Sequence, residues 1–346
     1  MTLRRSSSVR VLHSGPTAEC PIRLDLLTNP YGPSMRVHEA LASADDLHLP
    51  AEERAGELRS RLAGIVGVAP SWLTLGSGAD ELIRTVVIAA GRNGPVIVFP
   101  PTESEGERIA RDLGQGLIAR SRSHRFGVDL DAADCWSIPT GAVAVVMSPN
   151  DPTGTNLSAQ DAVRLSRACK VVIVDERHGA YSGRSLVPLV REFDNVIVVQ
   201  SLETWAGLSG FPVAYAIAPP KMSAIIASAT PAHGVAMGSV VAACATLDDL
   251  AFMKGTIARV RDEKSRLYRT LRKLNMVRPL PSWANFVLVR VERGERDYFV
   301  RELADRKIRV HRPDQVELED FFRVSATSAE QTHALKQALI EAALPL

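Results

Sequence analysis

Residues 196–215 read VIVVQSLETWAGLSGFPVAY, and this stretch decides the fold. It begins with the apolar run Val196 to Val199, whose length and β-branched residues predict a buried strand. A short polar turn follows, and the chain then passes through the small-residue segment 206–210. The stretch therefore predicts a strand of a buried sheet that ends in a polar turn.

Three other runs of the same kind lie at residues 96–99, 143–147 and 171–174. All four are apolar throughout and do not alternate, which predicts a mostly parallel sheet that is buried on both faces. A polar residue follows each run within a few positions: Glu103, Asp151, Asp175 and Thr204. Because ligands of parallel sheets bind beyond the carboxyl ends of the strands, we expect these four residues to converge on one crevice.

The composition excludes several classes of function. The chain has 346 residues, with 46% hydrophobic and 23% charged residues, which is typical of a soluble globular protein with a large core and two lobes. The net charge of +2 gives no reason to expect nucleic acid or an anionic membrane surface as a partner. The N-terminus lacks an apolar signal segment, so we expect a cytoplasmic protein. No apolar run is long enough to cross a membrane.

The cysteine and histidine spacings predict no metal site. The four cysteines include no C-x-x-C pair and are expected to be buried thiols. Residues 35–66 have apolar residues at helical spacing and predict a helix. Residues 76–81, GSGADE, predict a glycine turn into a helix N-terminus, a place where backbone N–H groups bind phosphate.

Together with four further segments, these motifs resemble those of the class I/II aminotransferases. The further segments are NPYGPS (29–34), SPNDPTG (148–154), DERH (175–178) and FRVSAT (322–327). The family consists of pyridoxal-phosphate (PLP) enzymes of fold type I, and the histidinol-phosphate aminotransferase branch is most similar. Its patterns read N-P-Y-G-P-S, G-x-G-[AS]-D-E, S-P-N-N-P-T-G, D-E-A-Y, S-K-x-x-x-x-x-G-x-R and R-I-[ST]-x-G-T. The resemblance extends from about Pro21 to about Ala342.

The resemblance implies an α/β fold of the fold type I PLP-dependent transferase kind. We expect a large domain at residues 36–245, with a mostly parallel central sheet flanked by helices. A smaller α/β domain would be formed by residues 1–35 and 246–346. The family likeness also implies a homodimer, in which Tyr31 and Leu49 approach the neighbouring subunit's crevice.

Residues that match the family's patterns take over its roles by resemblance. Gly78, Ala79 and Asp80 would belong to the phosphate cradle. Asp175 would pair with the pyridine nitrogen, which makes PLP an electron sink. Arg323 would hold a substrate carboxylate, and Tyr31 would lie near the substrate.

Other positions depart from the patterns. Thr204 falls on the lysine that holds PLP, and the arginine that binds its phosphate falls on Pro212. Further departures are His178 for a tyrosine, Asp151 for an asparagine, Glu103 for the aromatic residue that stacks on the ring, and Leu49 for a tyrosine. From these departures we expect no transamination and no covalently held cofactor, with PLP bound noncovalently if it binds at all.

The function expected from these changes is a PLP-independent enzyme that acts on a small, carboxylate-bearing, amino-acid-like substrate. Several titratable groups in one crevice shift each other's pKa and suit general acid–base chemistry. The expected catalytic residues are His178, Glu103, Asp151 and Asp175, and the expected substrate-binding residues are Arg323, Tyr31 and Thr204. Two alternatives stay open. One is an inactive pseudoenzyme that binds a small molecule or an active homologue, and the other is an enzyme with noncovalent PLP or pyridoxamine phosphate.

Overall fold

A computed structural model describes residues 21–130, 138–231 and 234–344. The expectation of a signal-free N-terminus falls on residues 1–20, which lie outside the described residues, as do Cys20 and Cys135. Cys169 is buried and Cys244 is partly buried, and both are free thiols. None of the helices in the three described segments has the length and the apolar run that a bilayer crossing requires.

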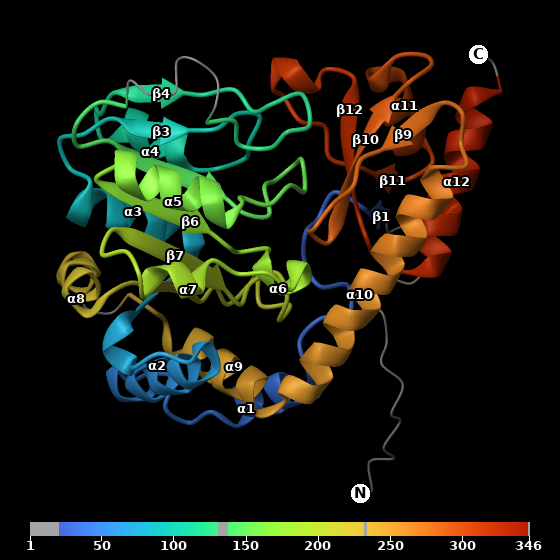
Figure 1. Cartoon of the computed structure of the whole chain (residues 1–346). Coiled ribbons are helices and arrows are strands. Elements are labelled where there is room, and N and C mark those ends of the chain that lie inside the picture. Colours follow the sequence, from blue (N-terminus) through green and yellow to red (C-terminus); the bar gives the residue numbers. More distant parts are fainter. Residues whose placement is uncertain (1–20, 131–137, 232–233, 345–346) are drawn as a thin grey trace, which may run out of the picture.

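A large sheet lies inside one half of the molecule, on the left in Figure 1. Its strands in the described part follow the order β2-β8-β7-β6-β5-β3-β4. Their bounds are β2 Leu73–Gly76, β3 Val96–Val98, β4 Leu117–Ala119, β5 Val143–Met147, β6 Val171–Asp175, β7 Val196–Ser201 and β8 Ala214–Ile217. Neighbours from β4 to β7 pair in parallel, and β8 is antiparallel to both of its neighbours. The expectation of a mostly parallel α/β sheet is therefore confirmed.

Helices cover both faces of this sheet, which explains why its strands are apolar throughout. Along β5, Val143 and Val145 pack with one helix layer, whereas Ala144 and Val146 pack with the other. The first layer contains α3 Ala79–Ala90, α4 Gly106–Asp112 and α8 Pro220–Ala229. The second contains α2 Glu52–Val66, α5 Ala159–Ala168, α7 Val187–Val190 and α9 Met237–Asp248. We call the sheet with these helices the large lobe.

The single helix predicted at residues 35–66 is wrong, because the structure has two. These are α1 Met35–Ser43 and α2 Glu52–Val66, separated by a short irregular segment. Pro50 lies in that segment. Proline lacks a backbone N–H and disfavours helical geometry at the residue before it, which accounts for the break.

A second, smaller group of strands joins the two ends of the chain. The strands β9 Val277–Pro279, β10 Phe286–Val291 and β12 Phe321–Ser325 form an antiparallel sheet, and β1 Ile22–Arg23 pairs in parallel with β11 Ile308–Arg309. The helices α10 Leu250–Leu271, α11 Arg296–Asp305 and α12 Ala329–Ala343 pack on them around a separate apolar core. We call this group the small lobe. The domain boundaries at residues 35/36 and 245/246 stay a prediction.

The described residues also form three short helices, η1 Pro70–Trp72, α6 Gly179–Ser182 and η2 Val316–Leu318. In Figure 1, α6 and the loops beyond the ends of the green and yellow strands face the orange strands of the small lobe. The carboxyl ends of the parallel strands thus point toward the junction between the two lobes.

Candidate functional site

The loops that follow the parallel strands meet at this junction. The backbone N–H of Glu103 donates to the carbonyl of Asp151 over 2.8 Å, so the loops after β3 and β5 are joined. The hydroxyl of Thr204 donates to the carbonyl of Arg177 over 2.9 Å, which joins the turn after β7 to the residues after β6. The backbone N–H of Ser148 donates to the carbonyl of Asp175 over 2.8 Å and joins these two pairs, so the four positions predicted to converge belong to one connected set of loops.

Asp175 is the last residue of β6, and its carboxylate is bound by Arg177. The Nε of Arg177 donates to both carboxylate oxygens, over 3.0 and 2.8 Å. Its Nη2 contacts Asp175 and also Asp80 in the first turn of α3. The Asp175 side chain is fully buried. Burial lowers the pKa of Arg177, and the Asp175 and Asp80 carboxylates raise it by more, so its pKa is raised overall and its charge is fixed.

Arg323 on β12 of the small lobe is bound by Asp151 of the large lobe. Its Nη1 donates to both carboxylate oxygens of Asp151 over 2.5 Å, and its Nη2 donates to the carbonyl of Asp25 over 2.8 Å. The two charged side chains are 5% and 7% exposed, so the pair is removed from water. The predicted carboxylate-binding group therefore already holds a carboxylate of its own chain.

Glu103 turns toward the small lobe. One carboxylate oxygen lies 3.3 Å from the Nε2 of His311 and 3.4 Å from the Nε2 of Gln315. The hydrogen bond to His311 is the main cause of the lowered pKa of Glu103, and burial opposes it. Glu103 thus bridges the lobes at the rim of the crevice.

His178 lies deep between the lobes as a neutral imidazole. Burial lowers its pKa to about 4, against an attraction from the Asp151 carboxylate and with a further lowering by Arg177 and Arg323. Its ring meets the Phe286 ring edge-on at 5.7 Å. Its Nδ1 is buried without a hydrogen-bond partner among the described residues.

The N-terminus of α3, where the phosphate cradle was predicted, faces Glu203. The Oε1 of Glu203 is buried and has no hydrogen-bond partner in the described structure. A Cβ built on Gly78 would lie 3.1 Å from this oxygen, so the carboxylate sits directly against the glycine turn. Burial raises the pKa of Glu203, while Arg177 and a hydrogen bond from the Ala79 backbone lower it by less.

Thr204 and Tyr31 are positioned by the N-terminal arm. The carbonyl of Thr204 accepts the backbone N–H of Asn29 over 2.8 Å. Tyr31 is half-buried and lies beneath the guanidinium of Arg259, 5.6 Å from its ring centroid. The arm thus brings Tyr31 near the turn after β7, and its role in substrate binding stays a prediction.

Sequence reasoning missed two residues of this crevice, Arg177 and Glu203. Their signal was present, since each is a charged residue next to a predicted site position at the end of a buried strand. It also missed the role of Asn150, whose side chain accepts hydrogen bonds from Thr102 and Arg122 and donates to the Pro101 carbonyl. Asn150 therefore fixes the loops rather than facing a ligand.

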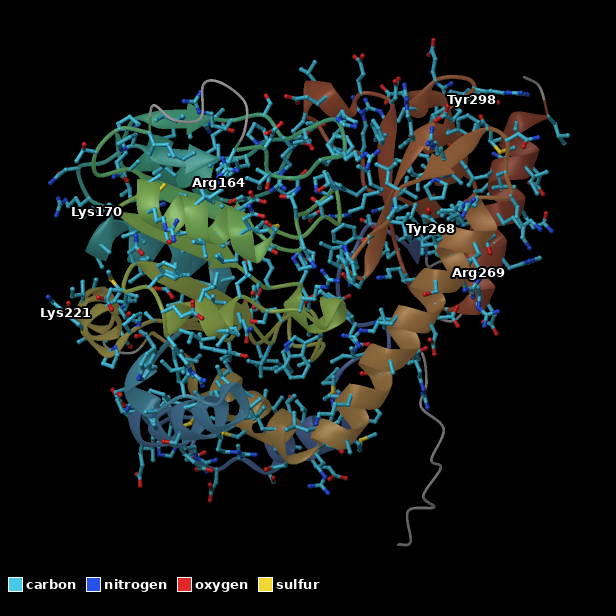
Figure 2. The ribbon with its side chains drawn as sticks, in the orientation of Figure 1. Arg164, Lys170, Lys221, Tyr268, Arg269 and Tyr298 are labelled. Atoms are coloured by element: carbon cyan, nitrogen blue, oxygen red, sulfur yellow. The ribbon has the colours of Figure 1, made fainter. Side chains whose placement is uncertain are left out.

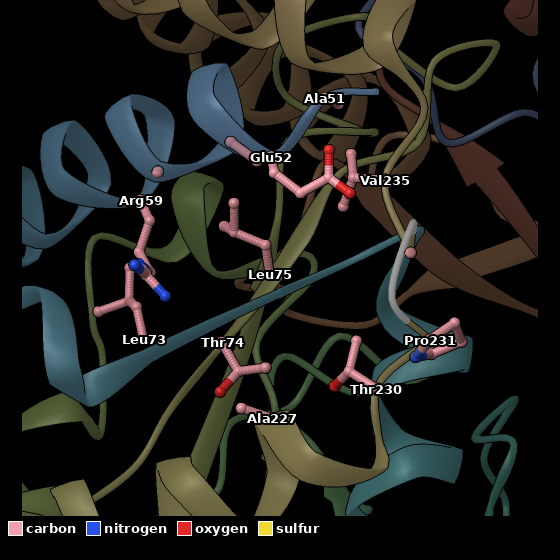
Figure 3. A pocket seen from close by; sticks show the side chains of 13 residues that line it. Ala51, Glu52, Arg59, Leu73, Thr74, Leu75, Ala227, Thr230, Pro231 and Val235 are labelled. Carbon is pink, nitrogen blue, oxygen red and sulfur yellow. The ribbon is translucent and has the colours of Figure 1, made fainter. Parts of the chain in front are cut away.

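Two of the hollows in the described part of the chain lie away from the crevice. One, of about 360 Å³, is lined by the start of α2, by β2 and by the end of α8, with Glu52 and Arg59 on its rim (Figure 3). The other, of about 900 Å³, lies where the loop 124–127 and the segment 153–158 face the small lobe. Neither is lined by a residue that was predicted as catalytic. Within the described segments no group of three or more His, Cys, Asp or Glu residues could hold a metal ion.

The paired charges correct the expected acid–base enzyme. Asp175 is bound by Arg177, Asp151 by Arg323, and Glu103 contacts His311. His178, the expected proton carrier, has a pKa near 4 and is neutral at physiological pH. A general base works best with a free lone pair and a pKa near the working pH, and no predicted catalytic residue has both. The site assignments themselves stay predictions.

Comparison with known proteins identifies the family. Residues 33–339 match the family described as aminotransferase class I and II. A histidinol-phosphate aminotransferase from Roseiflexus castenholzii is 33% identical over 95% of this chain and 91% of its own length. A chloroplastic histidinol-phosphate aminotransferase from Nicotiana plumbaginifolia is 29% identical over 94% of this chain and 80% of its own length.

Solved structures agree in fold. The histidinol-phosphate aminotransferase of Sinorhizobium meliloti, in complex with pyridoxal-5'-phosphate, superposes with a TM-score of 0.83 at 22% identity and covers 99% of this chain and 98% of its own. The enzyme of that name from Clostridium acetobutylicum gives 0.85 at 18% identity, over 94% and 100% of the two chains.

These findings overturn two expectations drawn from the sequence. The PLP-independent enzyme and its alternatives are contradicted, because relatives that match almost the whole chain are named histidinol-phosphate aminotransferases. The expectation of no covalent cofactor is contradicted as well, because the family match and the relatives named histidinol-phosphate aminotransferases point to PLP, with which a solved enzyme of that name is in complex. The resemblance and the fold class are confirmed, and this chain belongs to the class I and II aminotransferase family.

Proposed function

We propose that this chain serves PLP-dependent amino-group transfer on substrates of the histidinol-phosphate class. The observation that carries the proposal is the placement of two groups at one edge of the sheet. Asp175 ends β6, and the glycine turn of residues 76–78 leads into α3. The names of the relatives that match over nearly the full length support the same activity.

The residues of the crevice fit much of PLP, which when bound supplies an electron sink for amino-group chemistry. A buried carboxylate such as Asp175 suits a protonated ring nitrogen, because opposite charges at short range favour the charged form. The N-terminus of α3 suits a phosphate. Arg323 suits a substrate carboxylate. Each of these groups is engaged by another side chain here, so the fit requires Arg177, Glu203 and Asp151 to move.

Thr204 is the position at which this chain lacks the lysine of the family's pattern. Aligned on the family's pattern, it takes the place of the lysine, and a hydroxyl cannot supply an amine. The sequence has no lysine between Lys170 and Lys221. Figure 2 shows both of these lysines on the side of the large lobe that faces away from the small lobe. At this position the crevice therefore does not match the family's pattern, and neither of these two lysines replaces the missing amine.

The proposal is tested by measuring the transfer of ¹⁵N from histidinol phosphate to a 2-oxo acid. Protein, PLP, ¹⁵N-labelled histidinol phosphate and a 2-oxo acid are incubated together, and mass spectrometry measures the label in the 2-oxo acid's amino product. We expect transfer of the label that requires both PLP and the protein and that falls at least about tenfold in Asp175→Asn, which removes the charge facing the ring nitrogen. Transfer no faster than with PLP alone would overturn the proposal. Adding Thr204→Lys as a parallel variant measures what the lysine position contributes.

We also propose a cytoplasmic homodimer, as expected from the family resemblance. Leu47 and Leu49, which follow α1, are 50% and 51% exposed, and Met35 on α1 is 68% exposed. Exposed apolar side chains that gather on one segment support burial against a second copy. Light scattering coupled to gel filtration should give twice the 37.5 kDa of one chain. A mass of 37.5 kDa at micromolar concentration would contradict the dimer.

A further inference from the structure

Three groups of the crevice suit a ligand: Asp175, the N-terminus of α3 and Arg323. A side chain of opposite charge already lies against each of them. Arg177 presents a cation to Asp175, Glu203 presents a carboxylate to the glycine turn before α3, and Asp151 presents a carboxylate to Arg323. We propose that these side chains stand in for the ring nitrogen of PLP, its phosphate and the substrate's carboxylate, and that PLP binds only by displacing the first two. The inference rests on the proposed function, and it adds an internal competitor to it.

The strongest part of the arrangement is the bridge made by Arg177. Its guanidinium contacts Asp175 at the end of β6 and Asp80 in the first turn of α3. These are the two places suited to the ring and the phosphate of one PLP molecule. A cation that spans them lies across the space in which that molecule would sit. The Arg177 side chain is only 16% exposed, so it is a buried part of the crevice and not a surface group that happens to reach it.

Glu203 occupies the phosphate end. Its carboxylate lies against Gly78, the residue that precedes a helix of 12 residues. An anion at this place is favoured by the free N–H groups and by the helix dipole, whether it is a phosphate or a carboxylate. Glu203 therefore places a carboxylate at the helix N-terminus without a ligand.

These side chains do not satisfy every polar atom of the crevice, which distinguishes it from an ordinary packed core. The Oε1 of Glu203, the Nδ1 of His178 and the Nε of Arg323 are buried without hydrogen-bond partners among the described residues. Buried polar atoms are nearly always paired, because leaving one unpaired costs free energy. The unpaired atom of Glu203 is an acceptor without a donor, so displacing Glu203 by PLP removes an unsatisfied oxygen from the buried crevice.

The internal competitor also predicts selectivity. A ligand that offers only a phosphate can replace Glu203 but leaves Arg177 in place, and a pyridine without a phosphate cannot satisfy α3. A ligand that displaces both has to carry a basic ring nitrogen and a phosphate on one rigid frame. A pyridine without a phosphate should bind poorly, because it would displace the Arg177 guanidinium from its carboxylates without supplying a phosphate to the crevice.

The test measures PLP binding without turnover. Equilibrium dialysis gives the Kd for PLP of the full-length protein and of Arg177→Ala, Glu203→Ser and the double variant. These changes introduce the residues that the family's patterns have at both positions. We expect the double variant to bind PLP at least tenfold more tightly than the unchanged protein. Its melting temperature without PLP should be lower, and PLP should raise that temperature by more than in the unchanged protein.

Arg191→Ala is the matched control, since Arg191 is an exposed arginine that hydrogen-bonds the carbonyl of Gly67 far from the crevice. Its Kd for PLP should equal that of the unchanged protein. Should the double variant not fold, Glu203→Gln keeps the bulk, removes the charge and should still tighten PLP binding severalfold. A Kd unaffected by the changes at Arg177 and Glu203 in folded protein would overturn the inference even if ¹⁵N transfer occurs. Absence of transfer with a tightened Kd would overturn the proposed function and leave the inference standing.

Discussion

At the scale of single residues, the crevice is ordered by charge pairs that the sequence pattern did not indicate. Sequence spacing placed Asp175, Asp151 and Thr204 at one edge of the sheet, because the ends of parallel strands must meet there. It could not place their partners. Arg323 is 172 residues away from Asp151 in the chain. Arg177 contacts Asp80 only because folding brings the two residues together. These pairings depend on tertiary packing, within the large lobe for Arg177 and between the lobes for Arg323, on which local sequence carries no information.

His178 gives a residue-scale prediction about pH. Its pKa is about 4 in the folded protein and 6.5 when exposed, so the folded state resists protonation that the unfolded chain accepts. The associated stability is complete above pH 6.5 and is lost as the pH falls toward 4. Between pH 7.5 and 5.0 the loss amounts to about 2 kcal/mol of unfolding free energy. Urea unfolding at the two pH values measures it.

His178→Phe keeps an aromatic ring against Phe286 but removes the titrating group, so its loss of stability between the two pH values should be about 2 kcal/mol smaller. His48→Gln, at an exposed position, serves as the control and should lose as much stability as the unchanged protein. Equal losses in His178→Phe and the unchanged protein would show that another group accounts for the acid sensitivity.

At the scale of elements, the apolar runs predicted the buried strands well, because a strand covered on both faces has no polar positions. The single helix over residues 35–66 failed, since apolar spacing continued across a break that Pro50 and the irregular segment impose. The turn after β7 was predicted as a small-residue segment, but its packing partner was not. The structure shows that Gly207 lies against the N-terminal arm at Gly32 and Pro33.

Gly207 therefore gives an element-scale prediction. Its φ of +69° is a left-handed geometry, and an added Cβ would lie 2.6 Å from the carbonyl carbon of Gly32. Gly207→Ala should destabilise the protein by about 2 kcal/mol or more, because backbone strain and a backbone clash add up. Gly210→Ala, three residues further along, meets no atom within 4 Å and should change stability by less than about 0.5 kcal/mol. Chemical denaturation compares the two, and equal effects would show that the arm moves aside freely.

At the scale of the whole molecule, the two lobes are tied together across the crevice by contacts of very different kinds. Glu103 and His311 form a partly exposed pair, with side chains 35% and 30% accessible. Asp151 and Arg323 form a buried pair. Length and composition predicted two lobes, and the resemblance assigned segments to them. Neither could indicate that a residue in the position of a family asparagine would become the anchor between the lobes.

The buried pair should account for more of the stability of the interlobe junction than the exposed one. Asp151→Ala leaves the Arg323 charge buried without its partner and should cost about 3 kcal/mol, whereas Glu103→Ala should cost less than about 1 kcal/mol. Because Asp151 joins the two lobes, its loss should also separate their unfolding, so that circular dichroism and hydrogen exchange within the small lobe report different midpoints. The double variant Asp151→Leu, Arg323→Met removes both charges together and should recover much of the loss, since no unpaired charge remains. If it is as unstable as Asp151→Ala, the cost arises from packing at this position and not from the isolated guanidinium.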